Sequence, residues 1–172
     1  MKRVIYYAVV ILLGFLLQHN LLTAGSILGN APNILLVITC VAGFLQGKKE
    51  GLFVGLACGF LKDIVISNTL GFYSLIYMYL GYLCGIFQKY VNSEFLTFPL
   101  VFCGAGDLLY QLYIFFIKFV LRNRMNFLFY FRTIMMPEIV YTIAVAIVLY
   151  QLLKKGNEKL CQLEKRSAKK FV

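Results

Sequence analysis

The chain contains no tryptophan and only one histidine in 172 residues. With His19 as its only imidazole, it has no HExxH zinc motif and no group placed to activate a serine or cysteine nucleophile. A phosphate-cradling GxxxxGK[ST] loop is also missing from the sequence. These absences predict a protein that is not an enzyme and that carries no cofactor.

Cysteine is present, but in no arrangement typical of a metal site or a disulfide framework. The sequence has no CxxC pair and no Cys/His cluster. One of the five cysteines, Cys161, lies in a charged tail, and the other four lie in apolar runs. Because buried cysteine usually acts as a small hydrophobic residue, we expect these four to be packing residues. They are Cys40, Cys58, Cys84 and Cys103.

What the chain has in abundance is apolar sequence. Hydrophobic residues occupy 61% of its positions, and its mean hydropathy is +0.81. Soluble domains use roughly 45–50% apolar residues, so most of this chain is expected to face lipid or other lipid-buried helices. Without tryptophan, tyrosine and phenylalanine must form the aromatic belts at the membrane surfaces. The predicted fold class is an all-α integral membrane protein.

Six apolar segments predict six transmembrane helices in one compact bundle, followed by a basic tail. The second and third segments are shorter than the roughly 17 residues that a span requires. They cross the membrane only if Lys48, Lys49 and Lys62 extend to the headgroups, and otherwise they form a re-entrant hairpin. The segments are 4–22, 32–46, 51–66, 70–87, 97–121 and 134–153, and the tail is 154–172.

The basic residues predict an orientation. Six spans would place 12 Lys and Arg on the side of the N-terminus and 5 on the other side. The positive-inside rule then puts both termini in the cytoplasm. The tail contains seven Lys or Arg against two Glu, and we interpret it as a topological anchor on anionic lipid. No nucleic-acid partner is predicted, because no folded domain is available to display the basic patch.

Glycine recurs at a spacing of four through the second and third segments and leads to an acid, Asp63. Residues four apart lie on one helix face, and small side chains let membrane helices approach closely. The spacing predicts a tight helix contact, within the chain or with a partner. We expect Asp63 to point inward and Lys62 to reach the headgroups, unless both simply end the helix. The glycines are Gly43, Gly47, Gly51, Gly55 and Gly59. The fourth segment has two glycines at the same spacing, Gly81 and Gly85.

The fifth segment carries a polar stripe. At about 100° per residue, Gly104, Asp107, Gln111 and Lys118 fall within about 60° of one another, over a length of about 21 Å. An ionised side chain at the bilayer centre costs roughly 2.5–3.5 kcal/mol on translocon-based scales. The stripe is therefore expected to face the bundle interior or a partner helix.

The sixth segment places Glu138 directly after Pro137. Proline is well tolerated in the first turn of a helix, so this pair either begins the helix or kinks it. Glu138 is then an interfacial carboxylate, a partner of Arg132, or a contact for another protein.

The order of these motifs resembles the rod shape-determining protein MreD family across essentially the whole chain. The residues that carry the resemblance are Pro32-Asn33, then Gly51-x3-Gly55-x3-Gly59-Phe60-Leu61-x-Asp63, then Gly71-Phe72. The resemblance implies a multi-pass protein of the bacterial inner membrane that belongs to the machinery for lateral cell-wall synthesis. It implies MreC as a direct partner. MreB, the glycosyltransferase RodA and a class B penicillin-binding protein would belong to the same complex. It also implies a fold similar to the six-helix substrate-binding components of energy-coupling-factor transporters.

Two functions follow from these patterns. The first is a non-enzymatic scaffold that docks the transmembrane helix of MreC through the glycine strip and the polar stripe. The second is a vitamin-binding subunit of an energy-coupling-factor transporter, with Asp107, Gln111 and Glu138 lining a polar pocket. Such subunits typically carry Ala-x3-Ala on their first helix. Here Ala8 is followed by Leu12 at that spacing, which favours the scaffold.

Overall fold

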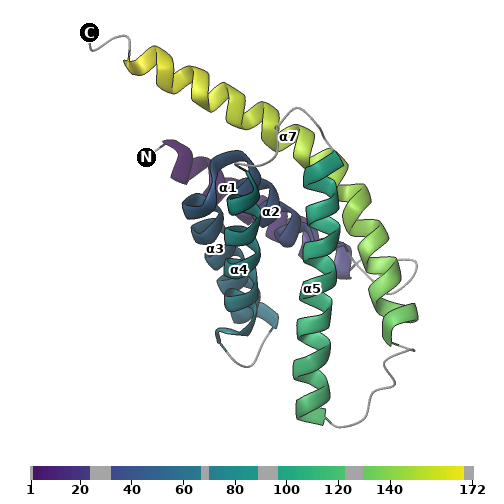
Figure 1. The fold of residues 1–172 in the computed structure, drawn as a ribbon. Helices are drawn as coiled ribbons and strands as arrows, with labels where there is room; N and C mark the ends of the chain where they lie inside the picture. Colours follow the sequence, from purple (N-terminus) through teal and green to yellow (C-terminus); the bar gives the residue numbers. More distant parts are fainter. Residues whose placement is uncertain (1, 24–31, 67–69, 89–96, 123–129, 169–172) are drawn as a thin grey trace.

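The structure is a computed structural model, and it describes residues 2–23, 32–66, 70–88, 97–122 and 130–168. All regular structure in these residues is helical. Six α-helices and one short π-helix follow one another along the chain (Figure 1). They are α1 (Lys2–Thr23), α2 (Ile34–Gln46), α3 (Lys48–Ile66), α4 (Phe72–Phe87), α5 (Thr97–Arg122), η1 (Phe131–Met135, the π-helix) and α7 (Met136–Ala168).

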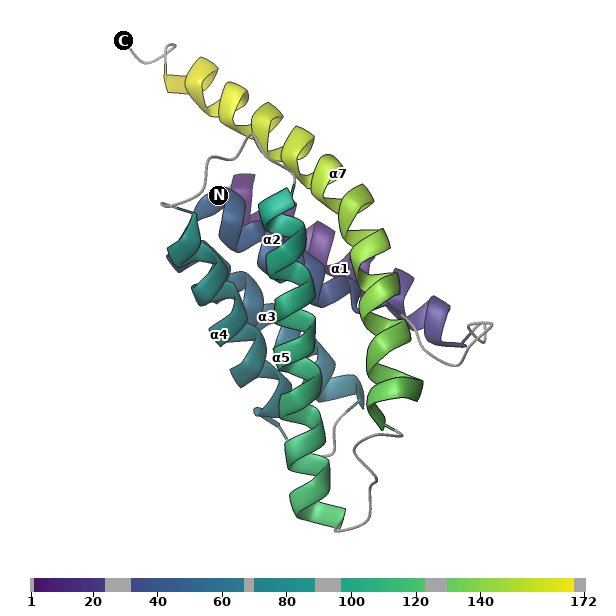
Figure 2. The same ribbon diagram turned by 45° about the vertical axis from the view of Figure 1, so that its right-hand side comes forward.

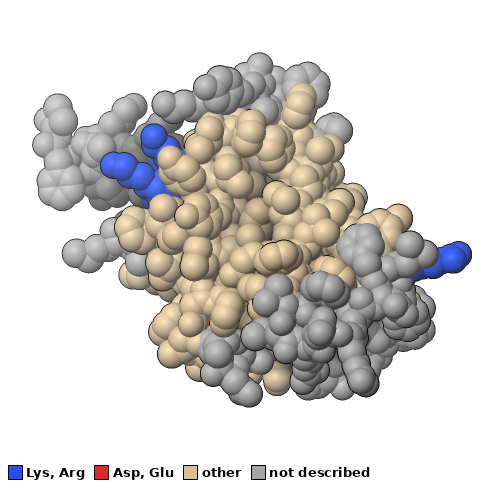
Figure 3. Space-filling view, turned by 60° about the horizontal axis from the view of Figure 1, so that its bottom comes forward, with Lys and Arg blue, Asp and Glu red and all other residues tan. Residues whose placement is uncertain are grey.

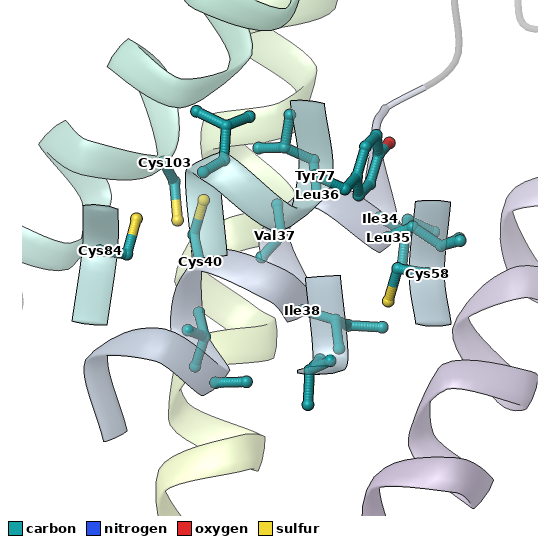
Figure 4. Close-up of a cluster of buried hydrophobic side chains, with 14 of the residues drawn as sticks. Ile34, Leu35, Leu36, Val37, Ile38, Cys40, Cys58, Tyr77, Cys84 and Cys103 are labelled. Carbon is teal, nitrogen blue, oxygen red and sulfur yellow. The ribbon is translucent and has the colours of Figure 1, made fainter. Parts of the chain in front are cut away.

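The central element is α2. It contacts α1, α3, α4, α5 and α7, and its side chains are buried from Ile34 to Phe44. Figure 4 shows the core around it, in which Cys40 of α2 lies near Cys84 of α4 and Cys103 of α5. All four cysteines of the apolar runs are buried. A helix with apolar residues on every face is the type that a bundle can surround completely.

A single glycine connects α2 to α3. Gly47 has a φ of +101°, a left-handed conformation that glycine adopts without a steric penalty. Its amide donates to the Gly43 carbonyl at 2.9 Å and so closes the last turn of α2. Because α3 begins at the next residue, the two helices form a tight hairpin against which α4 packs (Figures 1 and 2).

The long helices α5 and α7 contact each other and α2. Helix α5 meets α4 through side chains, among them the rings of Phe102 and Phe87, whose centres lie 4.6 Å apart. In Figure 2, α7 crosses the bundle and extends past it toward the C-terminus. Each helix starts within three residues of its predicted position, but α7 does not end at Leu153, where the apolar segment does. It continues to Ala168, because the basic sequence that follows contains good helix formers and no proline.

Two helical stretches, Phe98–Ile117 and Phe131–Gln162, are long and apolar enough to cross a membrane, and three further apolar helices are shorter. Large apolar side chains are exposed on several helices; Phe53, Phe116 and Val140, for example, are 68%, 67% and 64% exposed. In the part of Figure 3 that is not grey, Lys and Arg appear only near two edges, with almost no acidic surface. Soluble monomers rarely expose continuous apolar surface of this kind.

Candidate functional site

The glycine strip of α3 forms a backbone-to-backbone seam with α4. A Cβ atom added to Gly51 would collide with the carbonyl oxygen of Gly81, and one added to Gly55 would collide with that of Tyr77. At Gly59 the added atom would meet the Cα of Ser74. These obstacles are main-chain atoms, which cannot move aside as the end of a flexible side chain can.

The seam continues into the turn between α2 and α3. A Cβ atom on Gly85 would meet the backbone of Lys48, and one on Gly43 would lie 2.6 Å from the Gly81 carbonyl oxygen. All six seam glycines of α2, α3 and α4 are buried. The chain's own α4 therefore fills the strip, which could accept a helix of another protein only if α4 were displaced.

Asp63 ends the seam by capping α4. Its carboxylate accepts hydrogen bonds from the amides of Gly71 (3.0 Å), Tyr73 (2.9 Å) and Ser74 (3.0 Å), and from the Ser74 hydroxyl. The first amides of a helix have no partner within it, and the helix dipole favours an anion there. Asp63 is fully buried, so the acid at the end of the glycine strip fixes the start of the neighbouring helix.

The prediction for Lys62 is wrong, because this side chain is only 6% exposed and does not extend to a membrane surface. Its Nζ donates to Asn33 Oδ1 at 3.2 Å and to the Tyr77 hydroxyl at 3.0 Å. It also lies 4.6 Å from the centre of the Tyr110 ring, within the range of a cation–π interaction. The last turn of α3 meets acceptors and aromatic rings from other elements, so the ammonium finds partners inside the bundle.

Asn33 connects Lys62 to the rest of the interior. Its Oδ1 also accepts from the Tyr77 hydroxyl at 2.6 Å, and its backbone amide donates to Thr142 Oγ1 at 3.3 Å. One residue at the start of α2 thereby joins α3, α4 and α7. We call Asn33, Lys62, Tyr77, Asp107, Gln111 and Thr142 the polar centre.

The polar stripe of α5 supplies two members of this centre. Asp107 is fully buried, and neither of its carboxylate oxygens makes a hydrogen bond to the described residues. Gln111 is 2% exposed and accepts from the Tyr130 hydroxyl at 3.2 Å. Gly104, on the same stripe, is buried against Ile143 of α7. The side chain of the fourth stripe residue, Lys118, lies outside the described part of the chain.

Glu138 is half-buried in the first turn of α7. Its charge lies near Tyr73 and Tyr130 in the fold. Among the described residues, no group of three His, Cys, Asp or Glu side chains is placed to hold a metal ion.

Comparison with known protein families matches residues 1–160 to the rod shape-determining protein MreD. The chain belongs to the MreD family. It is therefore a membrane protein with a role in determining rod shape, which is a structural role. The comparisons with curated proteins and with solved structures gave no match.

For this MreD-family chain, the likeness to vitamin-transporter components stays a prediction, and the transporter alternative gains no support. Sequence reasoning also missed how several polar residues come together, namely Asn33, Lys62, Tyr77 and Thr142. A lysine next to an apolar glycine strip was the available signal, because a cation in such a setting either reaches water or finds buried partners.

Proposed function

We propose that the chain is a non-enzymatic scaffold of the cell-elongation complex that docks MreC in the bacterial inner membrane. Through MreC it would help to position or regulate lateral-wall peptidoglycan synthesis by RodA and a class B penicillin-binding protein, with MreB on the cytoplasmic side. Family membership supports this role. The observation that carries it is the seam of α3 and α4, whose main chains touch at successive glycines and so form a rigid core in lipid.

The docking surface is expected on the outside of the bundle. Because α4 occupies the glycine strip, a partner helix must contact side chains that point outward. Exposed apolar residues suited to such a contact occur on α3, α5 and α7, among them Phe60, Val101 and Val148. Contact between membrane helices depends on close packing rather than on expulsion of water, so a docked helix should follow one helix face.

Photo-crosslinking in cells tests this proposal. A photoreactive amino acid placed singly at Phe53, Phe60, Val101, Leu112 or Val148, all exposed, should give crosslinks to MreC at positions on one face. Cys58, which is fully buried, provides the matched inward control and should give none. Absence of MreC crosslinks from every outward position of a folded, expressed protein would contradict direct docking.

We also propose that both ends of the chain lie on the cytoplasmic side. The Tyr6 hydroxyl of α1 lies against Gly156 of α7, and Gln46 of α2 donates to Asn157 at 3.2 Å. The start of α1 and the basic extension of α7 thus share one end of the bundle, where the lysines can meet anionic lipid. A reporter that works only in the cytoplasm should be active when fused to the C-terminus. Activity of a C-terminal reporter that works only in the periplasm would contradict this orientation.

A further inference from the structure

The polar stripe of α5 contains buried polar atoms that make no hydrogen bond. Both carboxylate oxygens of Asp107 and the Nε2 of Gln111 are buried without a partner among the described residues. The two residues are 0% and 2% exposed. Because they are four positions apart, they lie on one face of the helix, with Cβ atoms about 5–6 Å apart. Buried polar groups nearly always have a partner, so this pair requires one that is not a protein side chain.

The contacts of two nearby glycines show what Asp107 faces. A Cβ atom added to Gly104 would lie 3.3 Å from Ile143 of α7, and one added to Gly106 would lie 3.8 Å from Leu36 of α2. At about 100° per residue, the Asp107 side chain points between these two directions. It is therefore directed toward the place where α2 and α7 meet.

Asn33 and Thr142 lie at this junction of α2 and α7. The backbone amide of Asn33 donates to Thr142 Oγ1 at 3.3 Å and so joins the two helices. The side-chain Oδ1 of Asn33 accepts from the Tyr77 hydroxyl at 2.6 Å, whereas its buried Nδ2 has no partner among the described residues. The junction thus contains a second unused amide donor near the unused acceptors of Asp107.

Water is the ligand that suits this set of atoms. A water molecule can accept from an amide and donate to a carboxylate that the amide does not reach directly. Buried waters typically make about three hydrogen bonds to groups that would otherwise be unsatisfied. A hard metal ion would need several oxygen acceptors, whereas Asn33 and Gln111 offer N–H donors here.

We propose that Asp107, Gln111 and Asn33 bind internal water at the junction of α2, α5 and α7. The water accepts from the two side-chain amides and donates to the Asp107 carboxylate. Hydrogen bonds to an ionised group are about twice as strong as neutral ones, so they offset part of the cost of burying this acid. The bound water connects α5 to α2 and α7, and this connection does not depend on MreC.

Radiolytic footprinting of the full chain in lipid nanodiscs tests for the water. Hydroxyl radicals that X-rays generate from a bound water oxidise the side chains beside it, even where bulk solvent has no access. Tyr77 is the reporter, because it is fully buried and its hydroxyl lies 2.6 Å from Asn33 Oδ1. The matched control is Tyr150, which is 2% exposed and lies about 12 Å beyond Thr142 along α7.

Tyr77 should be oxidised several-fold faster than Tyr150. A scavenger that removes radicals from bulk solvent should leave the oxidation of Tyr77 unchanged, because the radicals arise at the site. Equal oxidation of the two tyrosines would overturn the proposal. Loss of Tyr77 oxidation in the presence of the scavenger would also overturn it, since bulk solvent would then be the source.

Variants of α5 test which residues bind the water. Asp107→Leu combined with Gln111→Leu removes the polar groups at similar side-chain size and should lower Tyr77 oxidation to the level of Tyr150. Leu112→Val, on the exposed face of α5, is the control and should leave it unchanged. Gln111→Leu alone should give a partial decrease, and it provides the test if the double variant does not fold. Unchanged Tyr77 oxidation in a folded Gln111→Leu or double variant would contradict the site.

Discussion

The α2–α3–α4 unit and the α5–α7 pair are packed by different means. Helices α3 and α4 touch through bare backbone at Gly51, Gly55 and Gly81. Helices α5 and α7 instead bring buried polar side chains to the centre, including Asp107 and Thr142. Packing within the α2–α3–α4 unit therefore requires glycine, which has no side chain, whereas packing of α5 and α7 requires particular side chains.

The difference matters because lipid tails are as apolar as the helices themselves, so little hydrophobic force drives membrane helices together. Close backbone approach gains many dispersion contacts but leaves no room for an added atom. Buried polar groups fix orientation through hydrogen bonds, so a change that preserves shape costs about as much as the hydrogen bond that it removes. The two regions should therefore respond differently to small substitutions.

The largest expected effect is in the seam. Gly81→Ala places a methyl group against the backbone of Gly51, and main chains cannot move apart without separating α3 from α4. We expect a loss of at least about 3 kcal/mol, at the upper end for overpacking, seen as a large fall in the yield of folded protein. Gly106→Ala is the control, because its Cβ would lie an ordinary 3.4 Å from Cys40 Sγ. Equal yields of folded protein from Gly81→Ala and Gly106→Ala would contradict the close backbone contact between α3 and α4.

The next largest effect is expected at the junction of α3 and α4. Asp63→Ala removes an acceptor of four hydrogen bonds at the start of α4. We expect a loss of about 1.5–3 kcal/mol, the range for hydrogen bonds to a charged group, measured by denaturant unfolding in detergent. Asp63→Asn keeps one oxygen and should lose less. If Asp63→Ala leaves the free energy of unfolding unchanged, the cap does not contribute to stability.

Smaller effects are expected where α7 and the segment before it meet the polar centre. Thr142→Val keeps the shape of the side chain but removes the acceptor for the Asn33 amide at 3.3 Å. The expected loss is about 1 kcal/mol, the usual net contribution of a neutral hydrogen bond. Tyr130→Phe, which removes the bond to Gln111 at 3.2 Å, should lose about the same. A loss as large as that of Gly81→Ala would remove the distinction between the two regions.

The smallest effect is expected at the extension of α7. Gln46→Ala removes the partly buried bond to Asn157 at 3.2 Å, and the expected loss is about 0.5 kcal/mol or less, as for most substitutions near the surface. Amide hydrogen exchange around Asn157 should nevertheless become faster, since local opening needs less energy than global unfolding. Unchanged exchange would show that the extension is held by other contacts.

The local features of the helices can be predicted from the order of the residues. Apolar length and the interruptions between segments determine where helices lie, and the spacing of four determines which face of α3 is bare. The helical period alone puts Gly104, Asp107 and Gln111 on one side of α5, and the structure places that side inward.

The partners that each helix face meets depend on how the whole chain folds. From spacing alone, the strip around Gly55 could have contacted another protein, whereas in the fold α4 covers it. Lys62 was expected at a membrane surface and instead lies beside Asn33 and Tyr77. Helical periodicity gives the direction of a side chain from its own axis, but the partners of that side chain come from residues far away in sequence. Their placement depends on how all the helices pack at once.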